Sequence, residues 1–205
     1  MNYINELCER YSELSFLADS ISRAVEEITK AYKSGGKILL CGNGGSAADC
    51  EHISGELLKG FIMKRIPKGE ELSALKEAIG DKSIHLQRGI PAIPLTSLSA
   101  AGTAFGNDVD PILTYAQLTY ALGRRGDVLI AISTSGNAKN VIYAVEVAKA
   151  LGITTVALCG KDGGELVKKA DISIVAPANE TYKIQEYHLP IYHAICAEAE
   201  RILFE

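Results

Sequence analysis

The stretches CGNGGSAAD, residues 41–49, and ISTSGNAKN, residues 132–140, decide the fold of this chain. The apolar run KILL precedes the first stretch and DVLIA precedes the second, and a helix-favouring segment comes after each of them. Each stretch is therefore expected to be a turn that connects a buried strand to a helix. In open α/β sheets such turns lie at the carboxyl ends of the strands, which is where ligands bind.

The composition of the two turns favours a small anionic ligand. Small residues allow backbone N–H groups to approach an anion closely, and the N-terminus of the following helix adds partial positive charge. Ser46, Ser133, Thr134 and Ser135 add hydroxyl donors. One such turn could equally serve strand-to-helix geometry and capping alone. Two of them favour binding of a phosphorylated small molecule.

A dinucleotide site is a competing interpretation of the first turn, because Gly42, Gly44 and Ala47 fit the pattern G-x-G-x-x-A. That pattern requires a second strand soon afterwards, ending in an acidic residue about 20 residues further on. The next apolar strand here, PAIPLTS at 91–97, comes too late and ends in no acid. No nucleotide cofactor is expected, and a dehydrogenase is the weakest functional hypothesis.

Length, charge and cysteine content narrow the class of protein. The 205 residues are 47% hydrophobic and 22% charged, which fits one globular domain over 1–205. A net charge of -4 indicates neither a nucleic acid nor a membrane as partner. The polar start MNYINELCERY is unlike a signal peptide, so a cytoplasmic location is expected. The five cysteines lack a C-x-x-C pair and are expected to be reduced core residues.

The apolar pattern predicts an α/β fold with a five-stranded parallel sheet flanked by helices. The predicted strands are the short apolar runs at 37–41, 91–96, 127–132, 154–159 and 172–176. Apolar residues three and four apart predict one long N-terminal helix that ends near SGG at 34–36. A C-terminal helix is predicted over 183–204, kinked at Pro190 because proline cannot donate a backbone hydrogen bond.

Residues 62–88 interrupt the regular alternation of strands and helices. Within them, EELSALKEAI would form a short helix with Leu72, Leu75 and Ile79 on one side. This insertion is expected to leave the sheet, as a lid, an interface element or a plain surface excursion.

His52 and Glu56 are candidate reactive side chains on the helix after the first turn. They lie four residues apart and share one face of that helix. Gln185 and His193 lie eight residues apart on a common face of the C-terminal helix, and His188 points elsewhere. Two imidazoles, a carboxylate and an amide oxygen could hold a metal, and the same groups could exchange protons with a substrate. Each residue alone is more often structural; the combination with two anion-binding turns indicates a site.

Six segments, taken in order, form a more specific pattern than either turn alone. They are CGNGGSAADCEHISGEL, PAIPLTS, AFGNDVD, LGRRGDVLIAISTSGNAKNV, GKDGGEL and TYKIQEYHLPIYH. This set resembles the sedoheptulose-7-phosphate isomerases, also called phosphoheptose isomerases, of the sugar isomerase (SIS) fold, over almost the whole chain except 62–88. The resemblance implies an aldose–ketose isomerase that acts through an enediol on sedoheptulose 7-phosphate to give a heptose 7-phosphate.

The resemblance also implies the roles of individual residues. Glu56 and His193 would be the catalytic pair, and one Zn²⁺ ion would be held by His52, Glu56, Gln185 and His193. The substrate-binding residues would be Asn43, Gly44, Gly45, Ser46, Glu56, Asn107, Asp108, Ser133, Thr134, Ser135 and Gln185.

The resemblance further implies a homotetramer with active sites between subunits, in which His193 is brought to Glu56 of a neighbouring chain. Apolar stripes on the N- and C-terminal helices also favour a homo-oligomer. The alternative is a non-catalytic sugar-phosphate-binding protein of the same fold, either a regulator or a protein of the replication-initiator-associating type. The glutamate and histidine retained in this chain favour the enzyme.

Three features depart from the family pattern. Ala138 stands where the family usually has the last serine of STSGNS, so one hydroxyl for the phosphate is missing. Lys59-Gly60-Phe61 stands where the family usually has Gly-Arg-Phe, and residues 62–88 replace a short connection. These departures preserve the reaction class and leave the identity of the sugar open.

Overall fold

Five short apolar segments form one parallel sheet in the computed structural model, which describes residues 2–205. The strands are β1 (Ile38–Gly42), β2 (Ala92–Pro94), β3 (Val128–Ser133), β4 (Thr154–Cys159) and β5 (Ile172–Val175). Their order in the sheet is β2-β1-β3-β4-β5, and all neighbouring pairs are parallel. The predicted five-stranded sheet is therefore confirmed, and every residue of β1 and β3 is buried because both faces of the sheet are covered.

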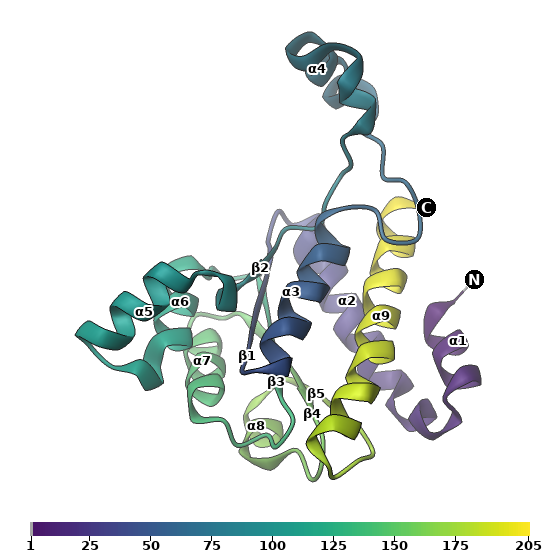
Figure 1. The fold of residues 1–205 in the computed structure, drawn as a ribbon. Helices are drawn as coiled ribbons and strands as arrows, with labels where there is room; N and C mark the ends of the chain where they lie inside the picture. Colours follow the sequence, from purple (N-terminus) through teal and green to yellow (C-terminus); the bar gives the residue numbers. More distant parts are fainter. Residues whose placement is uncertain (1) are drawn as a thin grey trace.

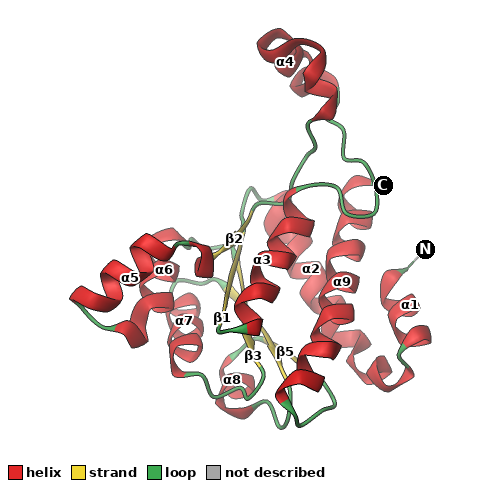
Figure 2. Ribbon diagram, in the orientation of Figure 1, coloured by secondary structure: helices red, strands yellow, loops and turns green. Residues whose placement is uncertain are grey.

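Helices cover the two faces of the sheet (Figures 1 and 2). On one face, Ile38 and Leu40 of β1 pack with α2 (Ala18–Lys33), α3 (Gly45–Leu58) and α9 (Thr181–Phe204). On the other face, Leu39 and Cys41 pack with residues of α6 (Thr114–Leu122), α7 (Lys139–Ala150) and α8 (Gly164–Lys169). The period-2 alternation of a strand thus divides the apolar residues between two cores.

The prediction of one long N-terminal helix is wrong. Helix α1 (Tyr3–Arg10) ends at Tyr11, whose φ of -133° and ψ of 76° are not helical, and a 3-10 segment, η1 (Ser12–Leu17), leads into α2. Leu14 and Leu17 are nevertheless buried. The apolar spacing identified the buried face correctly, but the backbone turns at Tyr11 so that α1 packs against α9.

The C-terminal helix is confirmed. α9 runs from Thr181 to Phe204 and continues on both sides of Pro190. Within residues 2–205, no helix has the length and apolar character needed to cross a membrane. All five cysteines are free thiols, and the four other than Cys8 are buried.

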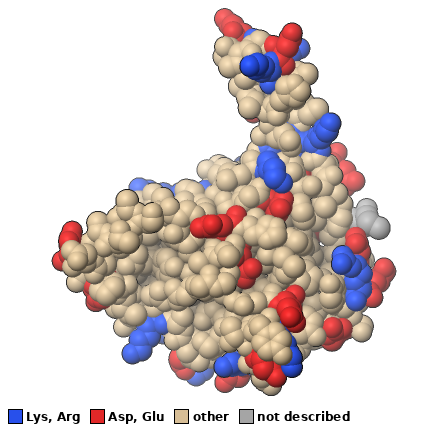
Figure 3. Space-filling view, viewed as in Figure 1, with Lys and Arg blue, Asp and Glu red and all other residues tan. Residues whose placement is uncertain are grey.

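The predicted short helix of the insertion is α4 (Gly69–Ile79), which packs on the 3-10 segment η2 (Gly80–His85). We call residues 66–86 the arm, because they stand away from the sheet and its helices (Figure 1). Among residues 69–79, all of which are described, no side chain is buried. The arm carries both basic and acidic groups on the face seen in Figure 3.

Three further elements lie between β2 and α6. They are the 3-10 segments η3 (Leu95–Ser97) and η4 (Pro111–Leu113), and the helix α5 (Ser99–Asp108) between them. α5 packs on η4 and α6, so it lies on the face of the sheet opposite α9.

Candidate active site

The two glycine-rich turns lie side by side because their strands are neighbours. β1 pairs with β3, and the strand order reverses between them. That reversal is the switch point at which doubly wound sheets bind ligands. Gly44 has a φ of +58°, a conformation that favours glycine, and there is no room for a side chain at Gly42 because Ser46 fills the space. The first turn therefore presents its backbone at the predicted place.

The second turn is held by its own hydrogen bonds. The Gly136 N–H donates to the Ser133 carbonyl at 3.0 Å, and the Asn137 N–H donates to the Ser135 hydroxyl at 3.2 Å. Gly136 has a φ of +66°, and a side chain there would collide with the Gly163 carbonyl. A turn fixed in this way would present its remaining donors to an anion without having to reorganise.

An amide pair joins the two turns. Asn43 and Asn140 exchange side-chain hydrogen bonds, each of 2.9 Å, across the switch point. Asn43 was predicted to line the sugar site, whereas Asn140 was missed. No local pattern in the sequence points to Asn140, because its partner lies 97 positions away.

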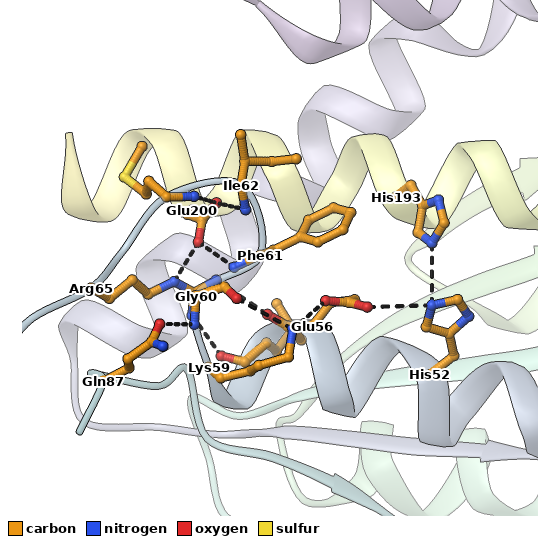
Figure 4. A network of polar contacts seen from close by, with 12 residues as sticks. His52, Glu56, Lys59, Gly60, Phe61, Ile62, Arg65, Gln87, His193 and Glu200 are labelled. Carbon is orange, nitrogen blue, oxygen red and sulfur yellow. Dashed lines mark hydrogen bonds and ion pairs between the residues drawn. The ribbon is translucent and has the colours of Figure 1, made fainter. Parts of the chain in front are cut away.

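Helices α3 and α9 bring the predicted reactive side chains together (Figure 4). His52 Nε2 lies 3.4 Å from Glu56 Oε1, as expected for residues one turn apart on α3. The same nitrogen lies 3.4 Å from His193 Nε2, which projects from α9. A carboxylate and two imidazoles thus form a row with His52 at its centre. A groove of about 240 Å³ between α1 and α9 also reaches His193.

Tyr192 orients the central imidazole. Its hydroxyl lies 3.0 Å from His52 Nδ1 and donates to Asp49 Oδ1 at 3.3 Å. Because the hydroxyl proton is directed to Asp49, Nδ1 of His52 is the donor and Nε2 keeps its lone pair toward Glu56 and His193. Sequence reasoning missed Asp49 and Tyr192, although each stands within three positions of a predicted residue.

Burial and neighbouring charges set the protonation states of the pair. Partial burial raises the pKa of Glu56, but the hydrogen bond and charge of Lys59, with His52 and His193, outweigh it and lower that pKa below its ordinary value. The Lys59 ammonium donates to Glu56 Oε2 at 2.9 Å. Burial, followed by the effect of His52, lowers the pKa of His193. At pH 7, Glu56 is therefore a carboxylate and His193 a neutral imidazole.

Known proteins are similar to this chain in sequence and fold. SIS domain models match residues 1–91 and 105–198. The phosphoheptose isomerase of Clostridium acetobutylicum is 39% identical over 186 residues, which are 91% of this chain and 84% of that protein. The structure of a phosphoheptose isomerase from Neisseria gonorrhoeae superposes with a TM-score of 0.76 and 32% identity, covering 96% of this chain and 94% of the other. One from Francisella tularensis also gives a TM-score of 0.76, with 28% identity and coverage of 97% and 95%.

The chain belongs to the phosphoheptose isomerase family. It is thus an isomerase with the SIS fold, as the resemblance implied. The roles that this family suggests for individual residues stay predictions, and their places in the structure can be compared with those roles.

The structure brings together some of the residues predicted from the family and leaves others apart. Gln185 lies against the first turn, where its amide fills the space that a side chain at Gly45 would need. Asn107 and Asp108 end α5, are exposed, and bond to each other through a 2.8 Å hydrogen bond. Because α5 packs on α6, they lie on the opposite face of the sheet from His193.

His193 lies near Glu56 of its own chain, whereas the resemblance implied that it meets Glu56 of a neighbouring chain. Within one chain, α3 packs on α9, and His193 already reaches Glu56 through His52. A second subunit is therefore not needed to bring this pair together, and a site shared between subunits stays a prediction. His188 faces away from this row, as predicted, and its Nε2 lies 3.0 Å from the buried Cys159 carbonyl.

The donor set of His52, Glu56 and His193 fits zinc in its chemistry. Imidazole nitrogens and carboxylate oxygens are the usual non-thiolate ligands of this ion, and Tyr192 holds His52 in the tautomer that a metal needs. Across residues 2–205, no three His, Cys, Asp or Glu side chains are arranged as a metal site as they stand. These three side chains would therefore have to move to bind one ion together.

Proposed function

We propose that this protein interconverts sedoheptulose 7-phosphate and a heptose 7-phosphate by aldose–ketose isomerisation. The observation that carries the proposal is the row of Glu56, His52 and His193 in a chain whose two glycine-rich turns lie side by side. Membership of the phosphoheptose isomerase family supports the same reaction.

In this reaction a proton moves between two adjacent carbons. The Glu56 carboxylate removes the proton from C1 of the open-chain ketose, and the oxygen on C2 takes a proton from water to complete the enediol. His193, protonated from solvent, then supplies a proton at C2, while the C1 hydroxyl gives its proton to water and becomes the aldehyde oxygen. Glu56 releases the proton it took to solvent, which restores the carboxylate. The lowered pKa of Glu56 keeps it in the basic form, and the lowered pKa of His193 makes its imidazolium a stronger acid.

We propose that one Zn²⁺ ion is bound by His52, Glu56 and His193, with the Gln185 amide as a further ligand. The ion would supply Lewis-acid polarisation of the carbonyl and its neighbouring hydroxyl. The hydroxyls of Ser133, Thr134 and Ser135 would hold the phosphate, and Asn43, Gly44, Gly45 and Ser46 would contact the sugar.

Asn107 and Asp108 require a second copy of the chain in this proposal. Helix α5 carries them on the face opposite His193 and buries none of its described side chains. We therefore infer that α5 meets another subunit and presents the two residues to that subunit's sugar site, in a homo-oligomer such as the family tetramer. A cytoplasmic location fits a substrate of this kind and stays a prediction.

Incubation with a panel of ketose phosphates tests the proposal. Zinc-loaded protein is mixed with five-, six- and seven-carbon ketose phosphates, and aldose formation is followed by NMR. The seven-carbon ketose should give an aldose signal and exchange its C1 proton with solvent. Binding of the sugar phosphate with neither signal, in protein shown to hold zinc, would instead indicate the non-catalytic alternative.

A further inference from the structure

A buried ion pair joins the start of the inserted stretch 62–88 to α9. Arg65 Nε donates to Glu200 Oε1 at 2.7 Å, and both side chains are 0% exposed. Removing two charges from water is costly unless nearly every polar atom of the pair finds a partner. The remaining contacts of this pair therefore show what the pair holds in place.

The Glu200 carboxylate organises the chain that leaves α3. Its two oxygens accept hydrogen bonds from the backbone N–H groups of Phe61, Ile62 and Met63, at 2.8, 2.7 and 3.2 Å. Three successive backbone N–H groups thus donate to one carboxylate. The chain bends around this carboxylate, so that Arg65 lies next to the end of α3 (Figure 4).

The Arg65 guanidinium caps the end of α3. Nη1 donates to the Leu57 carbonyl at 2.7 Å, and Nη2 donates to the Glu56 carbonyl at 3.2 Å. The last carbonyls of a helix have no partner within it, and a cation there also opposes the partial negative charge of the helix end. One of the two capped carbonyls belongs to Glu56 itself.

The same pair acts on both helices of the active site. Glu200 comes seven residues after His193, about two turns of α9, and so lies along the same side of the helix. We propose that Arg65 and Glu200 are positioning residues, which fix the end of α3 against α9 and thereby set the spacing between Glu56 and His193. This inference rests on the proposed function for its catalytic consequence, but its structural consequence stands apart from turnover.

A second ion pair on α9 offers a matched control. Glu198 accepts from Arg201 at 2.7 Å and from the Tyr3 N–H at 3.0 Å, so it ties α9 to α1 and not to α3. Glu198 is also buried, with 3% of its surface exposed. Loss of stability alone should therefore appear in variants of both pairs, whereas loss of α3 positioning should appear only in variants of the Arg65–Glu200 pair.

The variants are Glu200→Gln, Arg65→Lys and, as control, Glu198→Gln, each in the full chain. Arg65→Lys keeps the charge opposite Glu200, but one ammonium group lacks the fork needed to reach both carbonyls. Each variant is measured for thermal unfolding, hydrogen exchange of residues 53–60, Co²⁺ affinity by visible absorption, and kcat and KM.

Glu200→Gln and Arg65→Lys should speed exchange of residues 53–60, weaken Co²⁺ binding by about tenfold and lower kcat by about tenfold, with KM changed less than threefold. Glu198→Gln should lower the unfolding temperature without these effects. A folded Glu200→Gln protein with wild-type exchange, Co²⁺ affinity and kcat would overturn the proposal. If Glu200→Gln does not fold, Arg65→Lys decides by the same criteria.

The two proposals can fail separately. If the wild-type protein isomerises no sugar phosphate, the proposed function fails, and hydrogen exchange of residues 53–60 still decides whether Arg65 holds the end of α3. If the wild-type protein is active and Arg65→Lys matches it in exchange and kcat, the positioning role fails and the isomerase stands.

Discussion

The two glycine-rich turns resemble each other in sequence and differ in the helices that they begin. The first leads into α3, which carries His52 and Glu56 on a face that remains accessible beside α9. The second leads into α7, whose Val141, Ala144, Val145 and Ala148 are buried against the sheet. A similar turn therefore begins a helix with accessible polar side chains in one case and a helix buried against the sheet in the other.

From this difference we expect the two turns to have different roles in substrate binding. The first turn would place the sugar against the reactive row on α3 and α9, and the second, fixed by its own hydrogen bonds, would anchor the phosphate. The Asn43–Asn140 pair links the two turns through two hydrogen bonds. Substitutions on the α3 side should then act on turnover, and those in the second turn on affinity.

Glu56→Gln tests the chemical side and should have the largest effect. The amide keeps the size of the side chain but cannot take a proton from carbon, so kcat should fall by about 100-fold or more. Binding of a phosphate ester, measured by calorimetry, should remain within about threefold. Glu51→Gln, an exposed change on the same helix, is the control. Near-normal turnover in Glu56→Gln would assign the base to another residue.

The buried His188 should make the stability of the fold depend on pH. Burial lowers its pKa to about 4, against an ordinary value of 6.5. A histidine with a lowered folded-state pKa resists protonation, so the unfolded chain binds more protons and stability falls as pH drops from about 6.5 toward 4. The free energy of unfolding should therefore fall by about 2 kcal/mol between pH 7 and pH 5 from this group.

The matched variant is His188→Met, which cannot titrate. The Cys159 carbonyl keeps a second partner in this variant, because it also accepts from the Ala176 N–H at 2.9 Å. Denaturant unfolding at pH 5, 6 and 7 should show a flatter pH dependence than in the wild type. An equal slope in both proteins would mean that other groups control the acid response.

Much of this fold could be predicted because its determinants are local. Apolar runs and strand-to-helix turns identified all five strands and both turns, since each signal occupies adjacent residues. The break at Tyr11 could not be predicted, because the apolar spacing of Leu14 and Leu17 continues across it. Periodicity identifies which face is buried and does not report a change in helix direction.

The residues on each helix of the site could be predicted, but the contact between the helices could not. Spacing assigned His52 and Glu56 to one face, and Gln185 and His193 to another, but the contact between α3 and α9 is a matter of packing between distant segments. Arg65 and Glu200 were missed because 135 positions separate them and no local pattern links them. The proposed role of Asn107 and Asp108 depends on a second chain, which the spacing of residues within one chain cannot supply.

Ser135→Ala tests the anchoring side and should have a smaller effect than loss of the base. The phosphate is bound in the ground and transition states alike, so KM should rise by about tenfold, or 1.4 kcal/mol, with kcat changed less than twofold. Ser173→Ala removes a hydroxyl from β5 and serves as the control. A loss of kcat with unchanged KM would place the second turn at the reacting carbons. The proposal that the first turn binds the sugar and the second binds the phosphate would then be wrong.

Ala138→Ser tests the second turn as a phosphate site and should have the smallest effect. Ala138 is the N-cap residue of α7, with extended φ and ψ of -68° and 108°, so a serine fits the backbone there. Its hydroxyl could bind the phosphate, which would tighten phosphate-ester binding by about 0.5 to 1.5 kcal/mol. It could instead cap α7, but Asn140 Oδ1 already accepts from the Val141 N–H at 3.0 Å, so the gain in stability should stay below about 1 kcal/mol.

Calorimetry with a phosphate ester and thermal unfolding distinguish these results, and Ala150→Ser, exposed at the far end of α7, is the control. Tighter binding with little change in stability would identify the second turn as the phosphate anchor, whereas stabilisation without tighter binding would mean that the phosphate lies elsewhere.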